Sequence, residues 1–259
     1  MRLQNYFRRG KEAGLLVGIC LLGIGGMPAG ARAKSDTEAK IQAKLDKELH
    51  KKKFQGVQAS VDDDVVTLTG TVTLYAYEAE AVKMAQHVDG VHAVRNGIAV
   101  AGPEISDAQL QQKILQKIQM DRAGFGEVFD AISVMVQQGV VMLGGHAVDP
   151  TTLGSAVAIA SYMPGVKAVI DNIHVDPLSP MDDQIRAAEF NAIYNYGPLQ
   201  QYATLPIRPI RISVQDGRVT LYGVVFTAMD KEIAGMRANQ VPDVFRVTND
   251  LQIVGQARE

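Results

Sequence analysis

The sequence predicts an α+β chain of three tandem small α-β-β-α-β domains, each a three-stranded sheet with two helices, behind an N-terminal signal segment. Two observations predict the repeat. A strand-like phrase occurs three times, as "VTLTG", "VMLGG" and "VTLYG", and a second phrase, "GVHAVRNGIAV", "GVKAVIDNIHV" or "DVFRVTNDLQI", follows each copy after the same interval. Unrelated strands would not keep a constant interval, so the chain contains a repeated unit.

The first 33 residues predict a secretory signal peptide. Four basic residues precede an apolar run of about 15 residues, and "ARA" at 31–33 has the small-x-small pattern of a cleavage site. The run is shorter than the roughly 20 residues that a membrane-spanning helix needs. We expect cleavage after Ala33, and an uncleaved N-terminal anchor is the alternative.

Cleavage after Ala33 would change both the cysteine content and the charge. It removes the only cysteine, Cys20, and leaves 21 basic against 27 acidic residues. The mature chain is then acidic and has no disulfide. Because nucleic-acid binding depends on neutralising phosphates, the charge argues against a nucleic-acid partner, and the absence of tryptophan weakens any case for base stacking.

The repeats divide the rest of the chain into domains at 34–102, 103–177 and 178–259. In each, apolar residues three and four positions apart predict a first helix, and a second helix separates the two repeated phrases. The predicted first helices span 36–52, 106–122 and 180–196, and the second helices span 73–88, 150–162 and 228–240. Ser106 and Ser179 are expected N-caps.

A β-hairpin is expected between the two helices of each domain. Its turns read "VDDDV", "VQQGV" and "VQDGR". The third residue of each loop, Asp64, Gly139 or Gly217, should adopt a left-handed backbone. The phrase that opens the repeat is then the second hairpin strand.

Gly70, Gly145 and Gly223 occupy equivalent positions in that second strand. We expect these structural repeat glycines to end the strand and to let the backbone of a neighbouring helix approach closely.

The strand "VxLxG", a helix and then "GVxxVxNxIxV" together resemble the BON domain, named for bacterial osmotic-shock and nodulation proteins. Residues 90–100 follow the pattern closely, with Asn96 at the asparagine position. The second repeat has Asp171 there, and the third has Asp243 in place of the glycine, so its helix-to-strand turn is expected to differ.

The resemblance implies an exported, non-enzymatic, periplasmic envelope protein that binds phospholipid surfaces or connects envelope components, often under osmotic stress. The family pattern contains no catalytic residues to carry over. We expect no cofactor, no metal and no small-molecule substrate.

The residues give little support to a metal site. His87, His92, His146 and His174 have no partner at metal-ligand spacing and are expected at the surface. "DDD" at 62–64 lacks the spaced ligands of a calcium loop and fits a turn better.

Five lysines near the end of the first helix form a candidate lipid-binding site: Lys44, Lys47, Lys51, Lys52 and Lys53. Lysines at a helix C-terminus also complement the helix dipole, which is the structural explanation. A basic patch for anionic headgroups is the functional one.

The third repeat has a longer connection between its first helix and its hairpin, "FNAIYNYGPLQQYATLPIRPI" at 190–210. Tyr194, Tyr196 and Tyr202 make it a candidate partner-binding loop, and a packed loop is the alternative. The sequence thus leaves two functions open: a module on the membrane phospholipid surface, or a scaffold for envelope proteins.

Overall fold

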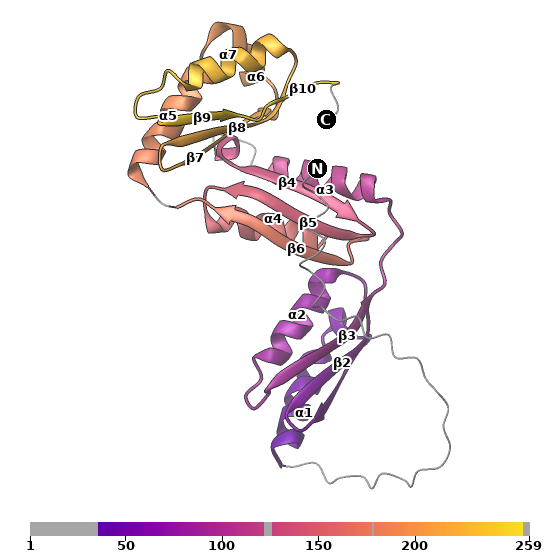
Figure 1. Ribbon diagram of the computed structural model, residues 1–259. Coiled ribbons are helices and arrows are strands. Elements are labelled where there is room, and N and C mark those ends of the chain that lie inside the picture. Colours follow the sequence, from indigo (N-terminus) through magenta and orange to yellow (C-terminus); the bar gives the residue numbers. More distant parts are fainter. Residues whose placement is uncertain (1–35, 122–125, 178, 256–259) are drawn as a thin grey trace, which may run out of the picture. The chain divides into compact units, whose positions relative to one another are not determined.

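The computed structural model describes residues 36–121, 126–177 and 179–255, which form three units of similar topology (Figure 1). The predicted signal segment lies outside the described residues. The first unit contains α1 (Asp36–Leu49), η1 (Lys52–Phe54), β1 (Val57–Asp62), β2 (Val65–Val72), α2 (Tyr75–Gln86) and β3 (Ala93–Val100). The second contains α3 (Asp107–Asp121), η2 (Gly126–Phe129), β4 (Ala131–Gln137), β5 (Val140–Ala147), α4 (Pro150–Ser161) and β6 (Ala168–Val175).

The third unit keeps this order and adds short elements. It contains α5 (Pro180–Tyr194), η3 (Gly197–Leu199), α6 (Gln200–Ala203), β7 (Ile210–Gln215), β8 (Arg218–Val225), α7 (Ala228–Ala238), β9 (Arg246–Asn249) and β10 (Gln252–Ile253). The α+β prediction with three tandem domains is confirmed. In the third unit the last strand is interrupted, so that both β9 and β10 pair with β8.

Each sheet combines an antiparallel hairpin with one parallel strand. β1 and β2 form the hairpin, and β3 lies parallel to β2 after the crossover through α2. In β2, Val66 and Leu68 are fully buried while Thr69 is exposed. Ile41 of α1 and Ala81 of α2 belong to the same core cluster as these strand residues, so both helices cover one face of the sheet.

The hairpin turns have the predicted left-handed backbone. Asp64, Gly139 and Gly217 have φ of 61°, 79° and 69°. The residue before each of them, such as Gln138 at 53°, also has positive φ. Two consecutive left-handed residues match the twist of the flanking strands and close a tight two-residue hairpin.

The repeated glycines lie inside the second hairpin strand, and the expectation that they end it is wrong. Gly145 pairs with Ile132, and β5 continues to Ala147. Its φ is +93°, and a Cβ there would lie 1.9 Å from the carbonyl oxygen of Ala131. The close approach therefore comes from the first hairpin strand, and the expected helix backbone is not the contact. Gly70 and Gly223 show the same geometry against Gly56 and Pro209.

The asparagine position of the last strand has a local explanation. The Asn96 side-chain oxygen accepts a hydrogen bond from the backbone N–H of Ile98 at 3.1 Å. Asp171 does the same for Ile173. Only an acceptor oxygen is required for this interaction, which explains why aspartate replaces asparagine in the second repeat.

The helix-to-strand turn of the third repeat keeps the backbone of the other two. Gly90 and Gly165 have φ of 93° and 91°, and Asp243 has φ of 64°. The expectation that Asp243 changes this turn is wrong as regards handedness, because aspartate is among the residues that tolerate a left-handed backbone.

Candidate functional site

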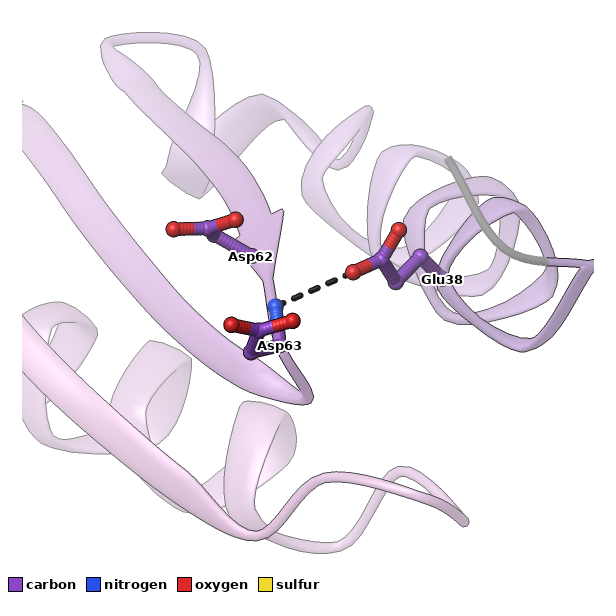
Figure 2. A group of neighbouring side chains, drawn as sticks. All are labelled: Glu38, Asp62 and Asp63. Atoms are coloured by element: carbon purple, nitrogen blue, oxygen red, sulfur yellow. Dashed lines mark hydrogen bonds between the residues drawn. The ribbon is translucent and has the colours of Figure 1, made fainter. Parts of the chain in front are cut away.

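Three carboxylates, Glu38, Asp62 and Asp63, gather where α1 meets the β1–β2 turn, and Figure 2 shows them approaching one another. The Asp63 backbone N–H donates a hydrogen bond to Glu38 Oε1 at 3.0 Å. This bond gives the group a structural role, because the turn presents N–H groups that need an acceptor. Asp62 and Asp63 are exposed, as the turn interpretation of "DDD" requires.

The other two repeats use one carboxylate in the same way. Asp107 accepts hydrogen bonds from the N–H groups of Gln138 and Gly139 at 2.7 and 2.9 Å. Asp182 accepts from Asp216 and Gly217 at 3.0 and 2.9 Å. The first helix of each repeat therefore holds the hairpin turn through an acidic residue, a function that sequence reasoning missed.

We expect Asp107→Ala to destabilise the second repeat by about 1–3 kcal/mol, because two turn N–H groups lose a charged acceptor. Asp107→Asn should cost less, since its side-chain oxygen still accepts one bond. Urea unfolding followed by circular dichroism measures both. Gln112→Ala, at an exposed position of the same helix, is the control. Equal effects of the two alanine variants would contradict the turn-holding role.

The five predicted lysines divide into paired and unpaired residues. Lys44 pairs with Asp89 at 2.9 Å, Lys51 pairs with Glu48, and Lys53 pairs with Glu80. Lys47 and Lys52 form no ion pair within the part of the chain that the structure describes. The lysines therefore form a surface of mixed charge rather than a uniform basic patch.

An open depression of about 320 Å³ lies beside this lysine segment, within the first repeat. Phe54 and Met84 give it apolar walls. Lys51, Lys53 and Lys83 supply positive charge around it, and the remaining lining residues are Glu80 and His87. Lys83 lies on α2. The sequence analysis considered only the lysines of one continuous segment, so it did not include Lys83. We call these seven residues the basic pocket.

Glu80 is the only acidic residue in the lining of the basic pocket. Burial acts to raise its pKa, but hydrogen bonds from Lys53 and from the Tyr162 hydroxyl, together with the lysine charges, outweigh burial and hold the pKa below its usual value. Glu80 is therefore ionised at neutral pH. Lys51 and Lys53 are paired with Glu48 and Glu80, so Lys83 is the lining lysine without an ion pair among the described residues.

Two of the three predicted partner-binding tyrosines are core residues. Tyr194 and Tyr202 are 1% and 0% exposed. The Tyr194 hydroxyl donates to the Ile210 carbonyl at 2.6 Å and accepts from the Ile210 N–H at 3.1 Å. Only Tyr196 is exposed, and the Arg237 guanidinium lies 4.7 Å from its ring centre. For Tyr194 and Tyr202, the packed-loop alternative holds.

His146 is a partly buried residue with specific partners, contrary to the surface position expected for it. Its Nδ1 lies 3.1 Å from Oδ1 of Asp176, whose side chain is 1% exposed. Gln215 donates to Asp176 at 2.6 Å, and Arg186 lies 3.5 Å from it. Burial acts to raise the Asp176 pKa, but the hydrogen bonds from His146 and Gln215 and the positive charges lower it. This network ties the end of β6 to the third repeat.

Large exposed hydrophobic side chains concentrate in the third repeat. Eight of the twelve among the described residues lie there, and none lies in the first repeat. Phe226, Met229 and Met236 are 48%, 69% and 57% exposed. Met229 and Met236 are seven residues apart on α7 and so share one helix face. The sequence analysis did not single out this face.

No helix in the described ranges combines the length and the apolar character needed to cross a bilayer. A comparison with curated proteins finds no match. Two solved structures of CdsD, a structural protein of the type III secretion system of Chlamydia trachomatis, show weak similarity to this chain. Their sequences are 13% and 12% identical to this one, and the TM-scores are 0.24 and 0.23. The matches cover 83% and 86% of this chain and 94% and 100% of the two CdsD chains.

The BON domain model matches three times, at residues 33–102, 106–177 and 183–255. These segments cover the three α-β-β-α-β units, although the third begins within α5, and they contain the phrases that the sequence repeats. BON proteins are typically periplasmic or envelope-associated and generally non-catalytic. The chain belongs to the BON domain family, with three tandem copies of the domain.

Proposed function

We propose that this chain is an exported, non-enzymatic, periplasmic envelope protein that binds phospholipid membrane surfaces through its first repeat and supports envelope integrity under osmotic stress. The observation that carries the proposal is the basic pocket, where apolar Phe54 and Met84 line the same depression as Lys51, Lys53 and Lys83. Such a pocket suits an anionic headgroup with adjoining acyl carbons. A lysine near an anionic surface contributes about 1 kcal/mol.

The test uses vesicles of phosphatidylglycerol and phosphatidylethanolamine, with phosphatidylcholine vesicles as the neutral comparison. We expect the chain without residues 1–33 to co-sediment with the anionic vesicles, and less so as salt rises, because exposed charge contacts are screened. Lys51→Glu with Lys83→Glu should weaken binding by more than about tenfold.

Lys47→Glu with Lys52→Glu is the matched control, because it changes the net charge equally outside the basic pocket. If both double variants lose binding to the same degree, the pocket is not the site and the attraction is general. Vesicle binding that neither double variant weakens would remove the lysines from the proposal.

A protein-interaction scaffold is the second candidate, and the apolar α7 face of the third repeat favours it. Methionine side chains adapt to differently shaped partners, and exposed apolar patches mark interaction sites. This candidate predicts no vesicle binding and a crosslinked envelope protein that is lost in Met229→Lys with Met236→Lys. Of the three tyrosines in the loop at 190–210, only Tyr196 is exposed and available to such a surface.

A further inference from the structure

The third repeat has a carboxyl group at a core position where the other two repeats have aliphatic side chains. The first helices of the three repeats can be aligned on their turn-holding residues, which are Glu38, Asp107 and Asp182. Seven residues after them come Leu45, Ile114 and Glu189, and all three are 0% exposed. Ile185 and Ile193, one turn to either side of Glu189, are also buried. Glu189 therefore points into the core of its repeat.

Within the part of the chain that the structure describes, neither carboxyl oxygen of Glu189 has a hydrogen-bond partner. Burial alone raises the pKa of Glu189 from 4.5 to about 8. The physical cause is the lost hydration of the ionised form, which nothing in the core replaces. The group is therefore protonated and neutral while the repeat is closed near neutral pH.

Other charged groups lie on α5 and on the elements packed against it. The helix packs against β7, η3, α6 and α7. Besides Glu189, the titratable residues of these elements are Asp182, Asp183, Arg186, Tyr194, Tyr202, Arg211, Asp230, Lys231, Glu232 and Arg237. Arg208, in the segment before β7, also faces α5, with its guanidinium 5.7 Å from the ring centre of Phe190.

Arg186 is the nearest cation along the helix, and it bonds Asp183, Asp176 and the Val214 carbonyl. Tyr202 bonds Asp230, and Arg237 bonds the Ala192 carbonyl and Gln240. None of these groups contributes to the pKa of Glu189.

We propose that Glu189 makes the third repeat a proton-dependent element, which is closed while this carboxyl is protonated and loosens as the pH rises. The sign follows from proton linkage. The closed repeat keeps its proton up to about pH 8, whereas the open repeat releases it near 4.5. Stability is therefore greatest below pH 4.5 and falls as the pH rises to about 8.

Hydrogen–deuterium exchange of the chain from residue 34 onward, resolved by repeat, tests the proposal. Between about pH 6 and pH 8 the protection factors of the third repeat should fall by at least about tenfold. Those of the first and second repeats, with Leu45 and Ile114 at the same position, should not change in this way. Expressing the data as protection factors removes the intrinsic pH dependence of exchange.

Two variants connect the effect to the carboxyl. Glu189→Gln keeps the shape and cannot ionise, and Glu189→Leu restores the residue of the first repeat; both should abolish the pH response. Glu232→Gln, at an exposed position of the same repeat, should retain it. A parent chain whose three repeats respond equally, or not at all, would overturn the proposal, and so would a Glu189→Gln chain that responds like the parent.

Discussion

Replacing Gly145 by valine is expected to unfold the second repeat and leave the first and third folded. The φ of +93° is costly for any residue with a Cβ, and such strained conformations cost about 1–3 kcal/mol each. In addition, the Cβ would lie 1.9 Å from the Ala131 carbonyl oxygen, a backbone atom held in the hairpin. The two effects together consume most of the stability expected of a domain of this size.

The alanine variant separates this explanation from one based on side-chain size. If bulk were the only problem, Gly145→Ala would be nearly harmless. Because the clash involves the Cβ itself, we expect Gly145→Ala also to destabilise the repeat by more than about 1 kcal/mol. Urea unfolding, with hydrogen exchange to assign the loss to a repeat, measures both variants.

Gly154 provides the matched control in the same repeat. It lies within α4, and a Cβ there would meet nothing within 4 Å. Gly154→Ala should therefore leave the second repeat intact or stabilise it by up to about 1 kcal/mol, because alanine favours the helix. Equal melts for Gly145→Ala and Gly154→Ala would show that the strand glycine is not constrained as described.

The repeated phrases predicted the α-β-β-α-β unit because they combine periodicity with turn residues, which are local signals. Gly145 was singled out correctly as a position without room for a side chain, but its neighbour was not predictable. A glycine in a strand shows that something lies close, without showing whether it is a helix or the paired strand. Only the register, with Gly145 opposite Ile132, identifies the Ala131 carbonyl.

The candidate sites were harder to predict because their contacts join distant parts of the chain. The lysine cluster was visible in the sequence, but its partners Glu80 and Asp89 and the third pocket lysine, Lys83, lie on or next to α2. Glu189 was missed for another reason. Sequence analysis normally assigns a glutamate in an amphipathic helix to the exposed face. The core position of Glu189 becomes evident only when the three first helices are aligned on their turn-holding carboxylates.

The tyrosines of the 190–210 segment show the same ambiguity between aromatic residues that bind partners and those that fill a core. Tyr202 is fully buried, and its hydroxyl donates to Asp230 Oδ2 at 2.8 Å and accepts from the Phe226 N–H at 2.7 Å. Asp230 also accepts a hydrogen bond from Thr227, the N-cap of α7. Burial raises the Tyr202 pKa to about 12, so the hydroxyl remains a donor at any physiological pH.

Removing Tyr202 is therefore expected to unfold or strongly destabilise the third repeat. Tyr202→Ala leaves a cavity in the core and should cost about 3–5 kcal/mol. Tyr202→Phe keeps the ring but leaves the Phe226 N–H without its acceptor and Asp230 without one donor, at about 1–3 kcal/mol. Tyr196→Phe, at the exposed neighbour, should remain within about 0.5 kcal/mol of the parent. Repeat-resolved hydrogen exchange in urea measures all three. A Tyr202→Phe chain as stable as Tyr196→Phe would mean that the buried hydroxyl does not anchor α7.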